Sequence, residues 1–214
     1  MLKKLLSSFF SYVSYPFSYN YELKRAIGSE IKTLLDIGCG SNSPVKIFSG
    51  KIHMVGIDDY IPSIAKSKQL GIHNEYYIMP FSDLKNFKNS SFDCVVALDV
   101  IEHLKKEEGL TLLDDIERIA KKRMILSTPN GFLPQAMYDN NPLQIHKSGW
   151  TPKELRKRGY NIIGYNGLKN LRGEKATIKF KPKLLWLCLS VLSQVFVRNH
   201  PDMAFQILCF KLKN

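Results

Sequence analysis

Short apolar runs alternate with longer amphipathic stretches through the chain. The apolar runs predict seven strands, at residues 33–37, 52–57, 76–79, 92–98, 123–127, 161–165 and 204–212. Residues 107–121 place apolar side chains at three- and four-residue steps, the period of a helix with one buried face. The predicted buried positions are Leu110, Leu113, Ile116, Ile119 and Ala120, and the basic residues 121–123 suit a helix C-terminus. Strands that alternate with helices are typical of a doubly wound α/β sheet, mostly parallel.

A further helix is expected to start at Thr151, which can cap it. Pro152 suits the first helical position, Glu154 can complete a capping box, and Gly159 ends the helix. Residues 167–201 then form an insertion before the last strand. Its apolar run, residues 184–197, is shorter than the ~18 residues of a membrane-spanning helix, so we expect no span.

Length and charge set the class of protein. The 214 residues suit one domain with a proper core, and the net charge of +12 favours anionic partners. Nucleic acid, acidic lipid and phosphorylated small molecules all fit that charge, as does a basic surface with no specific anionic partner. The four cysteines form no C-x-x-C pair, so we expect reduced thiols in a cytoplasmic protein and no metal site.

Residues 1–30 form a separate basic and aromatic segment before the domain at 31–214. Its apolar stretch is broken by serines and lacks a small-x-small cleavage site, which argues against a signal peptide. A lid over the active site, a peripheral membrane contact and a helix packed on the domain all stay open.

The first and second predicted strands end in residues that can bind a nucleoside. Asp36 precedes Gly38 and Gly40, where a sharp turn can bring the backbone close to a ligand, and it can accept hydrogen bonds from a cationic amino group. Asp58 ends the second strand, where an acid can bind two ribose hydroxyls. Together they predict a nucleoside site at the carboxyl edge of the sheet.

Four segments resemble the motifs of class I S-adenosylmethionine-dependent methyltransferases. They are DIGCGS at 36–41, VGID at 55–58, SFDCVVALDVIEHL at 91–104 and MILSTPNG at 124–131. The third and fourth are similar to the subgroup that includes ubiquinone-biosynthesis enzymes. The resemblance covers residues 33–165 and implies a Rossmann-like seven-stranded sheet, mostly parallel with an antiparallel last strand. It also implies S-adenosyl-L-methionine as the cofactor.

The resemblance also implies roles around that cofactor. Members of the family usually have an acid at the end of the third strand that contacts the adenine, but Pro80 or Phe81 falls there. Asp83, or the backbone of Phe81 and Ser82, is the expected substitute. The remaining roles are the methionine portion for Asp36, Gly38 and Gly40, the ribose for Asp58, the adenine for Asp59 and Tyr60, and the sulfonium side for Leu98 and Asp99.

The two histidines near the carboxyl edge are candidate general bases. His103 follows the fourth strand, and His146 lies in the loop before the capped helix. An amine or phenolate acceptor needs little beyond positioning, whereas a hydroxyl acceptor benefits from a base. For each histidine a packing role is the alternative, and Tyr138 is a weaker candidate.

The predicted function is methylation of a small molecule, with a hydrophobic or lipid-linked acceptor favoured by the two apolar segments. RNA methylation is the alternative that the charge favours, although no RNA-binding module is recognisable. A nicotinamide dehydrogenase would need glycine where Ser43 stands. A catalytically inactive cofactor-binding protein also stays open, as does a homo-oligomer.

Overall fold

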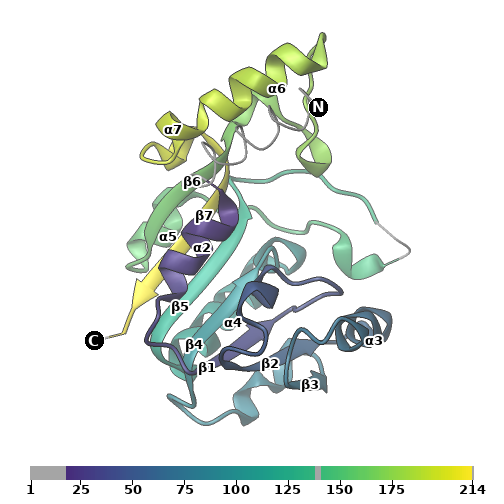
Figure 1. The fold of residues 1–214 in the computed structure, drawn as a ribbon, viewed down its shortest axis with the longest axis vertical. Helices are drawn as coiled ribbons and strands as arrows, with labels where there is room; N and C mark the ends of the chain where they lie inside the picture. Colours follow the sequence, from purple (N-terminus) through teal and green to yellow (C-terminus); the bar gives the residue numbers. More distant parts are fainter. Residues whose placement is uncertain (1–17, 138–140, 214) are drawn as a thin grey trace, which may run out of the picture.

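A seven-stranded sheet runs through the molecule in the order β3-β2-β1-β4-β5-β7-β6 (Figure 1). The computed structural model describes residues 18–137 and 141–213, so the segment 1–17 and Tyr138 lie outside the described residues. β7 is antiparallel to both of its neighbours, and the other pairings are parallel. The predicted Rossmann-like sheet with one antiparallel strand is confirmed.

The strands lie where the apolar runs place them, with shifted ends. β1 and β4 match their predicted ranges, as does the last strand, whereas β5 and β6 are longer than predicted. Their bounds are β1 Thr33–Ile37, β2 His53–Asp58, β3 Glu75–Ile78, β4 Phe92–Leu98, β5 Ala120–Pro129, β6 Asn161–Leu168 and β7 Ala204–Leu212.

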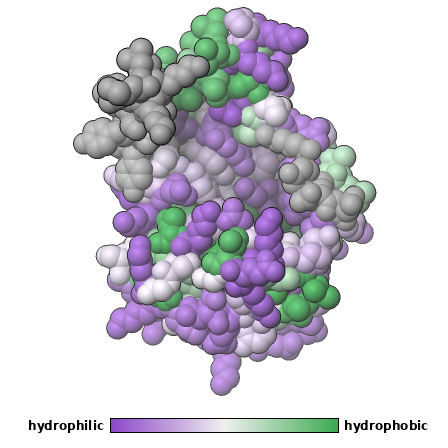
Figure 2. All heavy atoms as spheres, turned by 45° about the vertical axis from the view of Figure 1, so that its right-hand side comes forward, coloured by the Kyte–Doolittle hydropathy of each residue, from purple (hydrophilic) through white to green (hydrophobic). Residues whose placement is uncertain are grey.

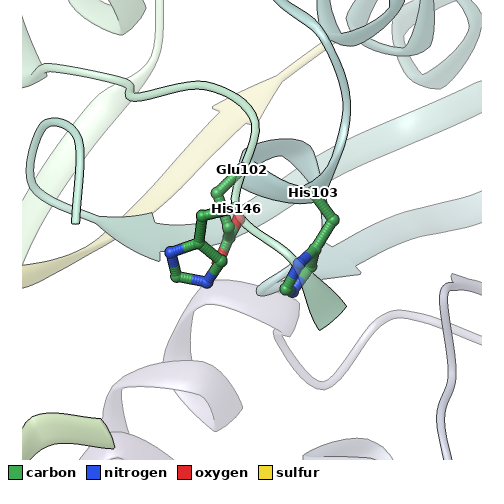
Figure 3. Close-up of side chains that lie close together, drawn as sticks. All are labelled: Glu102, His103 and His146. Atoms are coloured by element: carbon green, nitrogen blue, oxygen red, sulfur yellow. The ribbon is translucent and has the colours of Figure 1, made fainter. Parts of the chain in front are cut away.

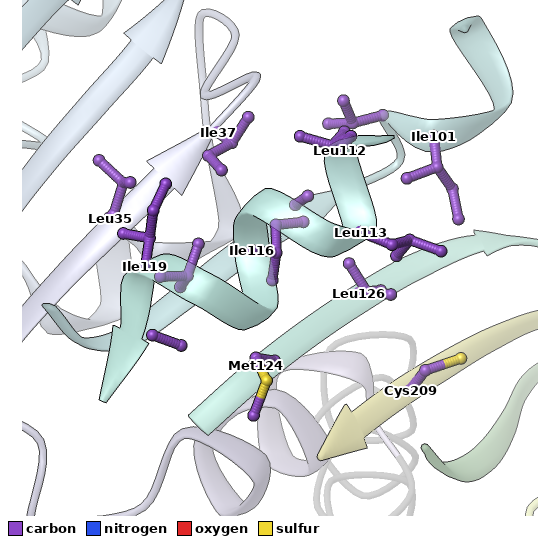
Figure 4. Close-up of a cluster of buried hydrophobic side chains, with 14 of the residues drawn as sticks. Leu35, Ile37, Ile101, Leu112, Leu113, Ile116, Ile119, Met124, Leu126 and Cys209 are labelled. Carbon is purple, nitrogen blue, oxygen red and sulfur yellow. The ribbon is translucent and has the colours of Figure 1, made fainter. Parts of the chain in front are cut away.

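Helices cover both faces of the sheet. Side chains alternate along a strand, so Leu34 and Leu35 of β1 enter different cores. On one face α4 (Lys106–Ile119) and α5 (Pro152–Lys157) pack on the sheet, as Figure 4 shows for α4. On the other face α2 (Tyr19–Ile27) does so, and α3 (Ile61–Gln69) follows β2. This layering leaves the carboxyl edge of the central strands open for a site.

The structure corrects the predicted helix between β4 and β5. Leu110 is 40% exposed, and the buried face consists of Gly109, Leu112, Leu113, Ile116 and Ile119. The basic residues after Ile119 belong to β5, not to a helix end, and two of them pair with acidic side chains. Lys122 pairs with Asp93 at 3.1 Å, and Arg123 pairs with Glu30 at 2.6 Å.

The insertion before the last strand is helical, as its apolar run suggests. α6 (Lys183–Leu192) and α7 (Gln194–Val197) lie beside the edge strand β6, at the top of Figure 1. Within the described parts of the chain, no helix combines the length and apolarity needed to cross a membrane.

Candidate functional site

The turn after β1 brings the backbone close to its surroundings. Gly38 and Gly40 have φ angles of 68° and 56°, in the left-handed region that glycine tolerates. A Cβ on Gly38 would lie 2.5 Å from Cγ2 of Val100, whereas a Cβ on Gly40 would meet nothing within 4 Å. The first glycine therefore permits close packing, and the second faces open space.

Asp58 holds the two loops of the nucleoside site together. Its Oδ2 accepts a hydrogen bond from the Gly40 N–H at 2.8 Å, and its Oδ1 accepts one from the Tyr60 N–H at 2.9 Å. Burial raises the pKa of this carboxyl group, and the two N–H donors counteract the rise. The contact between Asp58 and the ribose stays a prediction. The two backbone hydrogen bonds already fix the position of the carboxylate that would make it.

Asp36 has a protein partner that the sequence does not reveal. Its Oδ2 lies 2.9 Å from Nε2 of His73, and the two side chains are 1% and 0% exposed. The ring of His73 lies in turn near Ser67, with Nδ1 3.5 Å from the hydroxyl oxygen. Through this buried contact Asp36 fixes the residues that lead into the glycine turn. A contact of Asp36 with the cofactor's amino group remains a prediction.

A first cavity of about 450 Å³ opens over the carboxyl ends of these strands. The hollow in the middle of Figure 2 lies between the upper and lower parts of the molecule. Of the predicted cofactor-binding residues, those that line the cavity are Gly38, Gly40, Asp58, Asp59, Phe81, Ser82 and Asp99. Those that do not are Asp36, Tyr60, Asp83 and Leu98. Phe81 and Ser82, rather than Asp83, face the space where the family places an adenine-binding acid.

Asp99 connects this cavity to a second one of about 380 Å³, since it lines both. Its φ of 55° is in the left-handed region, and Ser127 donates a hydrogen bond to its Oδ1 at 3.0 Å. Tyr19 of α2 donates to Ser127 at 3.4 Å. The Asp99 side chain is exposed where the two cavities open, and partial desolvation by the surrounding protein raises its pKa. A strained, supported carboxylate thus stands at the junction of the two cavities.

Glu102, His103 and His146 meet beside this junction (Figure 3). One ligand atom from each lies within 4.8 Å of the others. All three line the second cavity, and His103 lines the first as well. The two predicted bases therefore come together, and Glu102 joins them, a residue for which the sequence analysis had no role.

Both histidines are oriented by backbone carbonyl groups. Nδ1 of His103 lies 3.3 Å from the Ile145 carbonyl oxygen, and Nδ1 of His146 lies 2.6 Å from that of Leu133. A carbonyl only accepts, so each Nδ1 carries a proton and each Nε2 keeps its lone pair. Burial, the largest cause in each case, lowers the pKa of His103 to about 4 and also lowers that of His146.

Glu102 is 3% exposed, and its Oε2 has no hydrogen-bond partner within the described ranges. Burial and the neighbouring Asp99 raise its pKa well above the ordinary value. A buried carboxylate oxygen without a partner is costly, and a bound cation would compensate it.

Two neutral imidazoles and one carboxylate form a ligand set for a divalent cation. The carbonyl groups on Nδ1 supply the outer contacts that such histidines usually have. The residues therefore fit a metal ion, which the sequence analysis did not expect.

Trp150 holds the loop that carries His146. The ring is 1% exposed, and its Nε1 donates to the Ile101 carbonyl oxygen at 3.2 Å. The backbone N–H groups of Lys147 and Ser148 donate to the Glu102 carbonyl oxygen at 2.7 and 3.1 Å. The loop is thus tied directly to the segment that carries Glu102 and His103, which sets the geometry of the cluster.

Comparison with known proteins agrees with this geometry. Residues 35–127 match the model of a methyltransferase domain. A SAM-dependent methyltransferase from Archaeoglobus fulgidus is similar over 91% of this chain and 92% of its own, with 18% identity and a TM-score of 0.61. Magnesium protoporphyrin IX methyltransferase from Synechocystis PCC 6803, solved with bound SAM, is 15% identical with a TM-score of 0.51, over 99% of this chain and 83% of its own.

The small RNA methyltransferase HEN1 is also similar, with 19% identity and a TM-score of 0.55, over 91% of this chain and 24% of its own. No curated protein gives a significant match to the sequence. At these identities the solved structures share the fold with this chain, and the ubiquinone-biosynthesis subgroup stays a prediction.

Proposed function

We propose that this chain is a methyltransferase that uses S-adenosylmethionine and methylates a hydroxyl oxygen of a small-molecule acceptor. Glu102, His103 and His146 would hold a divalent cation beside the second cavity, and that cation would supply an electrophilic site for the acceptor oxygen. The observation that carries the proposal is the position of this cluster at the wall shared by the two cavities.

The arrangement supports an in-line transfer. Gly38, Asp58 and Phe81 line the first cavity and would hold the cofactor there. Asp99 and His103 line both cavities, so the sulfonium methyl group and an acceptor atom would meet beside them. Holding two reactants in this way supplies much of the acceleration of a displacement reaction.

A hydroxyl acceptor explains why the cluster is needed. A neutral hydroxyl is a weak nucleophile, and a bound divalent cation would lower the pKa of an oxygen that it ligates. The hydroxyl proton would pass to the carboxylate of Asp99, which lines both cavities. The oxygen would form the new bond to the methyl group, and the sulfur would keep the electron pair of the broken bond and leave in neutral S-adenosylhomocysteine. The chain's own residues orient the acceptor and shield it from water. Leu133 and Phe205 provide apolar walls, and Gln135 and Gln206 provide polar ones. The cavity volume of about 380 Å³ suits a small molecule with an apolar body.

RNA is the second candidate acceptor, favoured by the net charge of +12. A phosphate backbone binds a basic protein with an affinity that falls steeply with salt. Salt-dependent binding of short RNA, together with methylation of its ribose, would favour this acceptor over a small molecule.

The metal content of purified variants tests the proposal. Glu102→Gln and His146→Ala are expected to lose stoichiometric Mn²⁺ or Zn²⁺ binding, measured by calorimetry and by mass spectrometry of the bound metal. Both should still bind S-adenosylhomocysteine and should lose methyl transfer to acceptors in a cell extract. His53→Ala is the matched control, since His53 is exposed and pairs with Glu75 at the amino ends of β2 and β3, away from the carboxyl ends of the strands.

Metal binding that is unchanged in both variants would contradict the cation site. A wild-type protein that does not bind S-adenosylhomocysteine would contradict the methyltransferase assignment itself. Metal binding and S-adenosylhomocysteine binding are measured separately, so the two failures can be told apart. Removal of metal with a chelator should abolish transfer, and added Mn²⁺ or Zn²⁺ should restore it.

A further inference from the structure

The helices of the insertion expose their apolar side chains. Leu184 is 74% exposed, Leu192 is 66% exposed and Val195 is 57% exposed. The apolar face of α6 and α7 consists of Leu184, Leu185, Leu187, Leu189, Leu192, Val195 and Phe196. Figure 2 shows it as a cluster of hydrophobic atoms at the upper end of the molecule. Contiguous apolar patches of this kind mark binding surfaces.

The polar side of the same helices faces the protein. Ser193 accepts a hydrogen bond from the Leu168 N–H at 3.1 Å. Gln194 accepts one from the Gly167 N–H at 3.2 Å and donates one to the Gly164 carbonyl oxygen at 3.1 Å. These groups belong to β6, the edge strand, whose backbone would otherwise need other partners. The helices thus satisfy the sheet edge with their polar residues, and their apolar residues are left facing outward.

Positive charge lies at the start of this face. Lys179 and Lys181 precede α6, Lys183 is its first residue, and all three are exposed. The sequence has no aspartate or glutamate between residues 175 and 201. Trp186 lies within α6, with its ring 4.9 Å from that of Phe180. Apolar residues with tryptophan and flanking lysines are the composition of a helix that lies in a membrane interface.

We infer that the apolar face of α6 and α7 docks on the surface of an anionic lipid bilayer. The helix lies in the plane of the interface and does not span it, since α6 has 10 residues. The three lysines attract acidic headgroups while the leucines enter the acyl boundary. A second copy of the chain is a poorer occupant, because a symmetric dimer would bring two sets of these lysines together.

The insertion that carries α6 and α7 also contributes to the second cavity. Ala176, which lines that cavity, comes a few residues before Lys179 in the sequence. The inference itself does not depend on the proposed reaction, because lipid binding is measured without substrate or cofactor.

Co-sedimentation of the full chain with vesicles tests the inference. We expect binding to phosphatidylcholine vesicles that contain 30% phosphatidylserine, and much weaker binding to phosphatidylcholine alone. The double variant Leu184→Glu with Leu192→Glu should bind at least tenfold more weakly. The triple variant Lys179→Gln, Lys181→Gln, Lys183→Gln should lose about fivefold per lysine at low salt.

A matched control carries the same new charges elsewhere. Leu70→Glu with Leu110→Glu alters two exposed leucines, 55% and 40% exposed, one directly after α3 and one on α4. This control should bind like the wild type, and all variants should retain the wild-type circular dichroism and S-adenosylhomocysteine binding. Equal loss in the control and in the Leu184 and Leu192 variant would overturn the inference.

Failure of the wild type to bind either kind of vesicle would also overturn it. A dimer in sedimentation velocity that the Leu184 and Leu192 variant dissociates, without any vesicle binding, would assign the face to a second copy. Vesicle binding that appears only after residues 1–17 are removed would assign the face to that segment of the same chain.

Discussion

Asp36 and His73 form a buried pair beneath the glycine turn. Among single residues, we expect the loss of one member of this pair to lower the free energy of unfolding most. His73→Ala would leave Asp36 buried without its partner 2.9 Å away. Breaking a buried pair in this way costs about 3–5 kcal/mol. His53→Ala, which removes an exposed pair with Glu75 whose side chains are 46% and 51% exposed, should cost about 0–1 kcal/mol.

Chemical denaturation of the two variants measures both free energies of unfolding. A loss for His73→Ala no larger than that for His53→Ala would contradict the role of the buried pair. The comparison is matched because each substitution removes one histidine that faces one carboxylate.

At the same scale, the sequence predicts those site residues whose position follows from a strand end. Gly38 and Gly40 lie in the turn that follows β1, Asp58 is the last residue of β2, and all three line the first cavity. Asp36 also ends a strand, but its partner His73 is 37 positions away, and no local pattern links them. Glu102 is missed for a related reason: its meaning depends on His146 approaching through a tertiary contact.

At the scale of elements, Gly109 of α4 decides how closely the loop before α5 packs. A Cβ at this position would lie 2.5 Å from Cζ2 of Trp150. Lys106 covers the ring at 3.6 Å and the indole N–H is hydrogen-bonded, so the ring has little freedom to move. Replacing glycine by alanine in a helix interior normally stabilises the helix by about 1 kcal/mol. At position 109 the clash of the added methyl group with Trp150 makes the same replacement destabilising.

We therefore expect Gly109→Ala to destabilise the protein by about 1–3 kcal/mol. The variant should also weaken cation binding, because Trp150 positions the loop of His146. Thr111→Ala, at an exposed position of the same helix, should change stability by less than about 0.5 kcal/mol. A Gly109→Ala protein more stable than the wild type in thermal unfolding would refute this account of the loop.

The same contacts explain which elements the sequence predicts well. Strand periodicity places β1, β4 and β7 because each is buried among neighbours on both sides. Of the positions predicted to be buried in the helix before β5, Leu113, Ile116, Ile119 and Ala120 are buried, and Leu110 is the exception. Gly109 is buried in its place because it packs against Trp150, and a glycine carries no apolar signal in the sequence. In the insertion the apolar run correctly predicts a helix, but it does not predict which side of the helix is buried. The polar side faces the protein because the backbone of β6 needs hydrogen-bond partners.

For the whole molecule, the test is whether one nucleoside binds the folded state and stabilises it. S-adenosylhomocysteine at 100 times its dissociation constant should add about 2.7 kcal/mol to the free energy of unfolding. For a chain of this length that corresponds to a rise in melting temperature of roughly 5–11 °C. Scanning fluorimetry measures the rise, and Asp58→Ala should abolish most of it because the loops around the first cavity lose their shared acceptor.

NAD⁺ at the same concentration is the control ligand, because it shares the adenosine but not the sulfur-bearing amino acid. An equal rise with NAD⁺ would mean that the cavity selects a nucleoside only, and no rise with either would contradict a cofactor site at the end of β1 and β2.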